Sequence, residues 1–230
     1  MPEKPEQDID LQRLKAAVHA AVESGVDLQR QVRDLMLAAL SSGRLDMPAM
    51  REVTRTTLEG VSSAAGIHGD RIPEVIRQSV AGVEEALQKA AEASKLAIQE
   101  AAGRTAEFSR NDLSKALDDL AAIEELFLET LGSAASAGSA AAAAVFGDFL
   151  SHFHNSGTDI GRQLAGIMAA LGEELPPVAN EGLRKGLDVA HTTADQLARF
   201  ASGFLAGIEQ GLDSTENRPA GNGREEKGSG

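Results

Sequence analysis

Two short segments of the chain place carboxylates and imidazoles at spacings that suit acid–base chemistry or metal binding. Asp148 and His152 are four residues apart, so in a helix their side chains share one face and could act as an acid–base pair. Asp188, His191 and Asp195 follow at spacings of three and four residues, which would put three metal ligands on one helix face. These two groups are the candidate sites of an enzyme or a metal protein.

The spacing of the other ionisable residues is better explained by a solvated helix surface. His152 and His154 are two residues apart, and in a helix they project to opposite sides and cannot chelate one ion. Adjacent carboxylates, such as Glu84 and Glu85, diverge by about 100° around a helix axis and do not form a catalytic pair. An exposed polar face is also the simpler interpretation of both candidate sites. We therefore predict that the chain is not an enzyme and has no catalytic, cofactor-binding or metal-ligating residue.

Sequence motifs of common enzymes are missing from the part of the chain that is expected to be ordered. There is no Gly-x-Ser-x-Gly elbow, no Walker loop ending in Gly-Lys-[Ser/Thr], and no Gly-x-Gly-x-x-Gly turn after a strand. The Glu-x-x-His element of di-iron bundles is also missing. The absence of Cys removes thiol nucleophiles, disulfides and zinc–thiolate sites.

The composition limits both the partners and the core. The chain has 230 residues, of which 35 are acidic and 22 are basic, giving a net charge of −13. Such an acidic chain repels phosphate, so nucleic acid is not an expected partner. Residues of hydrophobic type make up 42% of the chain, but only 3% are aromatic and many are Ala. The core must therefore be built more by close backbone packing than by large side chains.

The sequence gives no indication of export or membrane insertion. The first residues, MPEKPEQDID, are acidic and proline-containing where a signal peptide has basic and apolar residues. The longest uncharged stretch, 130–147, consists mostly of Ala, Ser and Gly, which gain little by transfer into hydrocarbon. We expect this stretch to pack on protein, and we expect a cytoplasmic location.

Apolar residues recur three and four positions apart almost throughout, which predicts an all-α fold. Residues 1–7 are expected to be disordered, and short N-terminal helices are expected within 8–68. Gly25 is expected to end the first of these helices, because glycine readily adopts the left-handed conformation that ends a helix. Asp27 and Asp46 are expected to cap the next two.

The region 72–212 is expected to form an elongated helical bundle around one long central amphipathic helix. Strong helix formers continue from 72 to 131 with only Gly82 and Gly103 as weak points. Apolar residues repeat every eleven positions, which keeps an apolar stripe nearly straight along the helix. The stripe is the row Ile76, Leu87, Ile98, Ser109, Leu120 and Leu131, in which Ser109 is the polar member. The segment Ser109-x-x-Asp112 resembles a capping box, so a break near 109–112 stays open.

Two further helices are expected. The first spans about 158–176 and is capped by Thr158, and the second spans about 178–212. Glycines four residues apart in the last helix, among them Gly203 and Gly207, predict the close approach of a neighbouring backbone. The polar residues 213–230 are expected to form a disordered tail.

Three segments resemble an uncharacterised bacterial family of Ala-rich helical proteins of about this length. They are MREVTRTTLEGV (50–61), EEALQKAAEASKLAIQEAA (84–102) and RFASGFLAGIEQGL (199–212). That resemblance implies no activity and transfers no site. More distantly, the Ala-rich amphipathic helices with eleven-residue spacing resemble phasins, which coat polyester storage granules, and apolipoprotein helices.

These observations favour a non-catalytic structural or surface-associating protein that acts through amphipathic helix faces, in the manner of coiled coils. The expected partners are a second copy of the chain or other proteins, with a lipid or granule surface as a further partner. One alternative is a cytoplasmic adaptor that scaffolds helical partner proteins. The other is an enzyme or metal protein using Asp148 and His152, or Asp188, His191 and Asp195.

Overall fold

The structure is a computed structural model that describes residues 10–104, 110–174 and 191–216, without the side chains of 110–111, 174, 191–195 and 211–216. Its regular elements are all helical, so the predicted all-α fold is confirmed for these residues. They are α1 (Leu11–Ser24), α2 (Leu28–Ser42), α3 (Met47–Ala64), the 3₁₀ helix η1 (Ala65–Arg71), α4 (Ile72–Gly103), α5 (Arg110–Ala121), α6 (Ile123–Ala137), α7 (Ala140–Ser156), α8 (Asp159–Glu174) and α10 (His191–Glu216).

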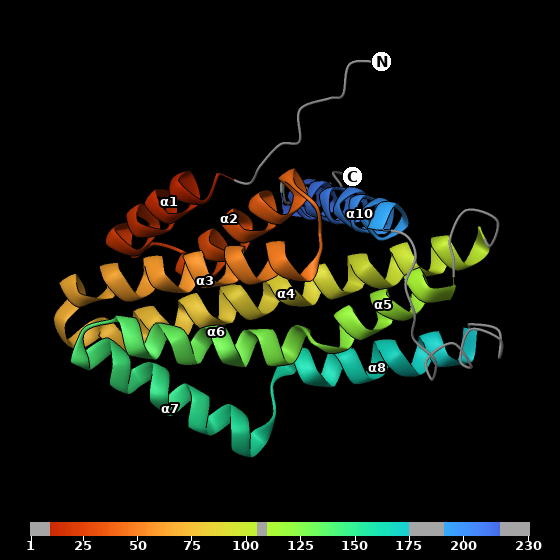
Figure 1. Cartoon of the computed structure of the whole chain (residues 1–230). Helices are drawn as coiled ribbons and strands as arrows, with labels where there is room; N and C mark the ends of the chain where they lie inside the picture. Colours follow the sequence, from red (N-terminus) through yellow and green to blue (C-terminus); the bar gives the residue numbers. More distant parts are fainter. Residues whose placement is uncertain (1–9, 105–109, 175–190, 217–230) are drawn as a thin grey trace, which may run out of the picture.

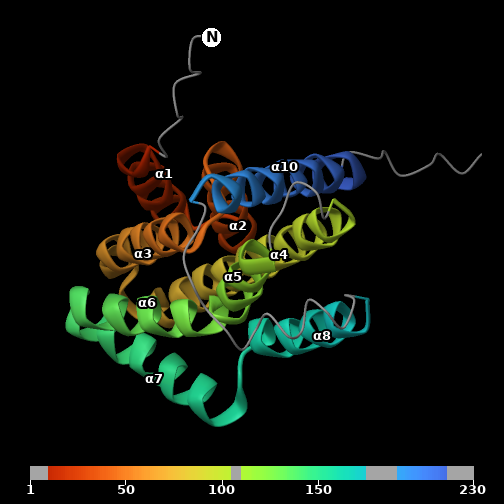
Figure 2. The same cartoon turned by 45° about the vertical axis from the view of Figure 1, so that its right-hand side comes forward.

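The helices are stacked around α3 and α4 (Figures 1 and 2). On one side, α1 packs on α3 while α2 and α10 pack on α4. On the other side, α6 packs on α3 and α8 packs on α4, and α7 lies outermost against α6 (Figure 1). The long amphipathic helix α4 is therefore enclosed by neighbours from both halves of the chain.

The N-terminal helices begin and end largely as their capping residues predict. The Asp10 carboxylate accepts a hydrogen bond from the Arg13 N–H at 2.9 Å, and Gly25 ends α1 in the left-handed conformation with φ 62°. The Asp46 carboxylate likewise accepts from the Ala49 N–H at 2.9 Å at the start of α3. Asp27 is an exception, because it has φ 43° and its side chain makes no capping bond to α2. The expectation that Asp27 caps α2 through its side chain was wrong.

The long central helix is present as α4, but it ends at Gly103 and does not continue to Leu131. Arg104 leaves the helical region with φ −111° and ψ 51°. From Arg110 onward the chain runs back along α4 as α5 and α6, with a turn at Ala122 between them (Figure 1). The break occurs where the weak helix former Gly103 precedes the capping-box segment, and Asp112 lies buried in the first turn of α5.

The apolar stripe is buried inside the bundle as a result of this reversal. Its apolar members Ile76, Leu87, Ile98, Leu120 and Leu131 are each no more than 1% exposed. The first three lie on α4, whereas Leu120 and Leu131 lie on α5 and α6. Residues that would line one straight rod instead belong to antiparallel helices of one core.

Gly82 sets how closely α2 can approach α4. A Cβ atom at this position would lie 3.1 Å from the Cβ of Val32 and 3.2 Å from the backbone N of Arg33, and it would overlap the carbonyl oxygen of Gln29. The partly buried Arg33 side chain closes the same contact, because its Nη1 lies 3.0 Å from Glu85 Oε1 on α4. Only a residue without a side chain fits at position 82.

A second glycine, Gly60, brings α1 and α3 together. A Cβ at Gly60 would lie 3.0 Å from Val18 Cγ1 on α1. By contrast, a Cβ at Gly203 or Gly207 of α10 would meet no atom within 4 Å. The prediction that these two α10 glycines allow close helix approach was wrong, because both face open space.

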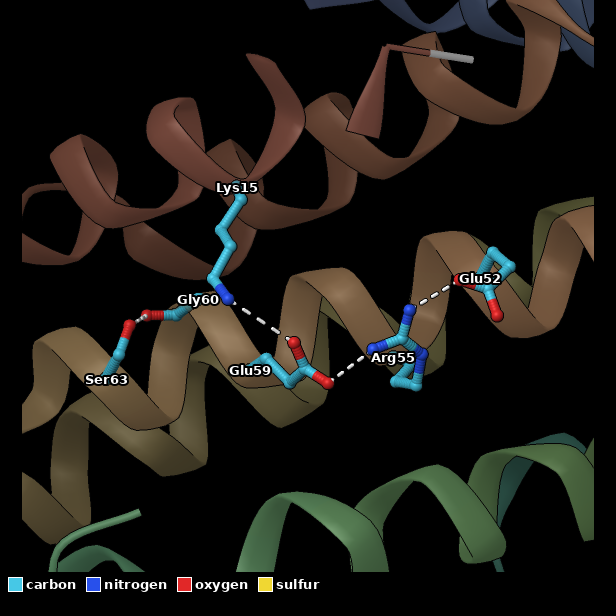
Figure 3. A network of polar contacts seen from close by, with 6 residues as sticks. All are labelled: Lys15, Glu52, Arg55, Glu59, Gly60 and Ser63. Atoms are coloured by element: carbon cyan, nitrogen blue, oxygen red, sulfur yellow. Dashed lines mark hydrogen bonds and ion pairs between the residues drawn. The ribbon is translucent and has the colours of Figure 1, made fainter. Parts of the chain in front are cut away.

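Ion pairs run along the surface beside Gly60 (Figure 3). Lys15 of α1 reaches Glu59 of α3 at 3.3 Å, and Arg55 joins Glu59 and Glu52 at 2.5 Å each. Burial would raise the pKa of Glu59, but the Arg55 and Lys15 cations outweigh it and hold this pKa below its usual value. These partly exposed pairs orient α1 on α3 but contribute little free energy each.

The last helix, α10, extends further than the sequence predicted. The backbone of α10 remains helical to Glu216, so the helix extends past residue 213, where the tail was expected to begin. Residues 1–7 and 217–230 lie outside the described residues. Among the helices of the described ranges, none combines the length and the hydropathy that crossing a membrane requires.

The contact at Gly82 predicts that Gly82→Ala destabilises the protein by about 1–3 kcal/mol, because the added methyl group forces α2 away from α4. The matched control is Gly207→Ala on the exposed side of α10, where alanine should stabilise by about 0.5–1 kcal/mol through helix propensity. Urea unfolding followed by circular dichroism measures both. Equal stabilisation by the two substitutions would contradict close packing at Gly82.

Candidate functional site

The helix α7 forms the edge of the bundle and is held by its two ends. The Ser139 side chain accepts a hydrogen bond from the Ala142 N–H at 3.3 Å and caps its start. Gly157 ends it with φ 73°. The turn before it packs tightly on α3, because a Cβ at Gly138 would overlap the Ser62 hydroxyl. The α6–α7 hairpin is therefore a fixed part of the fold.

The inner side of α7 is anchored by aromatic rings. Ala142 and Phe146 are fully buried. The Phe153 ring lies 5.6 Å from the Phe127 ring of α6 and 5.9 Å from the Phe149 ring, in tilted geometry. The clustering of Phe146, Phe149 and Phe153 in the sequence thus marks the side of α7 that faces the core.

The opposite side of α7 is exposed and almost free of charge. It consists of Ala140, Ala141, Ala144, Asp148, Ser151, His152 and Asn155, which are all exposed, and we call it the outer α7 face. Asp148 is the only Asp, Glu, Lys or Arg in the sequence between 132 and 157, although 25% of the chain is charged. The outer α7 face thus has one carboxylate, in a chain of net charge −13.

The candidate pair Asp148 and His152 lies on this outer α7 face, and both residues are exposed. Neither lines the cavity or the groove described below, and general acid–base catalysis depends on groups that hold a substrate and exclude water. Among the residues that the structure describes, no group of three or more His, Cys, Asp or Glu side chains is placed to hold a metal ion. Asp148 and His152 are thus an exposed pair on the surface of α7.

The second candidate group cannot be assembled from the described residues. Asp188 lies outside them, and His191 and Asp195 belong to α10 with only their backbone described. The metal hypothesis for these three residues therefore stays a hypothesis.

A pair of carboxylates that the sequence did not single out meets the first turn of α8. Glu84 Oε1 of α4 accepts a hydrogen bond from the Asp159 N–H at 2.9 Å. Glu124 Oε1 of α6 accepts from the Thr158 hydroxyl at 2.6 Å, and Thr158 Oγ1 accepts from the Gly161 N–H at 2.8 Å. Thr158 caps α8 as expected, and two further helices contribute acceptors to the same turn.

The surroundings of Glu84 oppose the ionisation of its carboxyl group. Burial raises the pKa of Glu84, and the nearby Glu124 charge raises it further. The Ile160 N–H and the Arg162 cation lower it but do not compensate. The arrangement positions α8 on α4 and α6, and every acceptor described here is used in capping.

A cavity of about 200 Å³ lies where α3, α4, α5 and α10 meet. Its walls include Leu45, Met50, Ile98, Leu120 and Leu197. Its charged side chains already have partners: Asp46 caps α3, Lys115 Nζ lies 2.6 Å from Asp119 Oδ2, and Asp112 is also engaged. Ligand pockets are usually about 300–1,000 Å³, so this cavity is small for a substrate site.

An open groove of about 530 Å³ separates α6 from the C-terminal half of α7. Leu128 and Leu150 form its apolar part. Glu124, Glu125 and Glu129 line the α6 side, and His154 lines the α7 side. The groove thus combines acidic side chains on the α6 side with two leucines, and Glu129 is paired with Arg51.

The Glu84 geometry predicts different effects for two substitutions. Glu84→Ala removes the acceptor at the start of α8 and should destabilise by about 0.5–2 kcal/mol. Glu84→Gln keeps an acceptor and removes the charge. Because folding raises the pKa of Glu84 above 4.5, the wild-type protein loses stability as the pH rises from the unfolded pKa through the folded pKa. The stability of Glu84→Gln relative to wild type should thus be greater at pH 7 than at pH 4, as measured by urea unfolding. A pH-independent difference would contradict this assignment.

Comparison with known proteins places the chain in one family. Residues 4–214 match the model of a family described as a family of unknown function, DUF6781. No curated protein and no solved structure matches the chain. The match spans most of the chain and agrees with the resemblance to an uncharacterised family. The chain belongs to the family of unknown function DUF6781.

Proposed function

We propose that the chain is a non-catalytic structural protein that acts by lateral contact between helices, and that it self-associates through the outer α7 face. The observation that carries this proposal is that the outer α7 face has a single carboxylate, Asp148, in a chain of net charge −13. The location proposed for this activity is the cytoplasm, as the sequence suggested.

Electrostatics make the outer α7 face a favourable place for two copies to meet. Two chains of this charge repel one another at most orientations, and the repulsion acts over about 8 Å at physiological ionic strength. Contact through a face with one carboxylate brings few like charges together. Ala140, Ala141 and Ala144 also leave room for a second helix to approach to the usual interaxial distance of about 8–10 Å.

The apolar stripe of α4 does not serve this purpose in the folded chain. Ile76, Leu87 and Ile98 are buried by neighbouring helices of the same chain, so they are not available to a second copy or to a granule. The exposed large apolar side chains among the described residues are Val26 and Ile67. Binding to an oily surface generally uses a contiguous apolar patch, so the described surface supports self-association better than phasin-like coating.

The proposal predicts that Ala144→Glu, which adds a charge to the outer α7 face, weakens self-association. The matched control is Ala169→Glu on the exposed side of α8, which adds the same charge elsewhere. Light scattering after gel filtration, from micromolar to millimolar protein, should show wild type and the control above the monomer mass of 24.0 kDa. Ala144→Glu should remain at that mass.

Two results would contradict the proposal. Wild-type protein that stays at 24.0 kDa over the whole concentration range would exclude self-association. Equal association of wild type and Ala144→Glu would place the contact on another surface. Co-sedimentation of the folded protein with neutral lipid vesicles would favour the coating role instead.

The groove between α6 and α7 supports a second candidate function, an adaptor for a helical partner protein. Leu128, Leu150 and the exposed Glu125 of this groove suit a basic amphipathic helix. Glu124 and Glu129 also line it and are engaged by Thr158 and Arg51. Fluorescence anisotropy should detect binding of a labelled Leu/Lys amphipathic peptide but not of a Leu/Glu peptide. Glu125→Lys should weaken that binding about tenfold, because it reverses one charge on the groove edge. Equal binding of both peptides would contradict the adaptor function.

A further inference from the structure

We infer that two copies of the chain pair through antiparallel α7 helices, with Asp148 of each copy facing the partner's His152. This inference rests on the proposed self-association and specifies its interface. The partner is a second copy, because the outer α7 face is complementary to itself in one arrangement.

The charge pattern of the outer α7 face selects that arrangement. Asp148 and His152 are its ionisable residues, and they lie four residues apart, about 6 Å along the helix axis. In an antiparallel pair whose two-fold axis passes beside residue 150, Asp148 lies opposite the partner's His152. The symmetry repeats the contact, so His152 lies opposite the partner's Asp148. Both carboxylates then meet an imidazole, which can donate a hydrogen bond or carry a charge.

Other registers of the same helices lack this complementarity. An axis beside residue 148 would put the two Asp148 carboxylates against one another. A parallel pair would also place identical residues side by side, with the same repulsion. Like charges directly opposed at an interface are unfavourable, so only the register around residue 150 places both ionisable groups against opposite partners.

The remaining residues of the face are compatible with this register. With the axis beside residue 150, Ala144 lies level with the partner's Ser156, and both are small and exposed. The flanking residues Ser151 and Asn155 are polar and uncharged. Apart from the paired His152, the side chains of the outer α7 face are small or of medium size, so the two helix axes can approach closely.

The size of this contact predicts a weak and reversible dimer. The overlap from residue 144 to 156 is about 18 Å long at 1.5 Å per residue. A single pair of short helices buries less than the roughly 1,600 Å² of a standard stable interface. We therefore expect dissociation constants in the micromolar to millimolar range.

The pairing is tested with two variants, one with only acidic residues and one with only basic residues at positions 148 and 152. His152→Asp makes both positions acidic, and Asp148→Lys with His152→Lys makes both positions basic. Each variant alone should associate about tenfold more weakly than wild type, because identical charges now face one another. An equimolar mixture of the two should associate at least as strongly as wild type. Sedimentation equilibrium measures the masses. Circular dichroism checks that each of the two variants keeps the fold.

The exchanged variant Asp148→His with His152→Asp provides the rescue, because it restores both reciprocal contacts and should associate like wild type. Ala169→Asp on α8 controls for the added acidic charge of His152→Asp and should associate like wild type. Failure of the mixture to associate, or wild-type association by each charge variant alone, would overturn the inference.

The result distinguishes this inference from the proposed function. If wild type remains monomeric at all concentrations, self-association itself fails. If wild type associates and Ala144→Glu prevents it, but the charge variants behave like wild type, the outer α7 face is the interface and the Asp148–His152 register is wrong.

Discussion

The bundle depends on the close approach of helix backbones at positions without side chains. At Gly82, α2 and α4 are so near that a Cβ atom would overlap the carbonyl oxygen of Gln29, and Gly60 has the same role between α1 and α3. A chain with 3% aromatic residues has few large side chains to fill gaps between helices. It gains its dispersion and hydrophobic energy by bringing Ala- and Gly-rich faces together over a long helix. Enclosure of α4 by helices from both halves of the chain follows from this need.

Because α4 is fully used in the core, the surfaces left for function are those of the outer helices. Among them, α7 has only Ala142 and Phe146 fully buried, and its outer face carries a single carboxylate. The partly buried carboxylates Glu84 and Glu124 position the start of α8, and Asp46 caps α3. Polar chemistry inside the described part of the molecule thus holds helices in place, while the uncharged surface lies at the edge.

Sequence features that act locally, such as helix caps, predicted much of this fold. Features whose effect depends on tertiary contacts, such as the apolar stripe and the glycine spacing, predicted less. Gly25 ends a helix, and Asp46 and Thr158 begin helices, where the sequence predicted, because capping depends on nearby residues. Helix propensity could not show that the chain reverses after Gly103, because an apolar stripe has the same spacing whether it lines one rod or two packed helices. For the same reason, the glycine spacing did not reveal that Gly82 packs against α2 while Gly203 faces open space.

The burial of the stripe by chain reversal is the central claim, and a distance between two spin labels tests it most directly. The chain has no Cys, so cysteines placed at the exposed Arg77 and Ser133 would be the only labelling sites. In one continuous helix these positions would lie about 80 Å apart. In the bundle, α6 returns toward the end of the molecule where α4 begins, and Gly138 packs on Ser62 (Figure 1). Double electron–electron resonance should give a single distance well below half of the rod value. A distance near 80 Å would contradict the account.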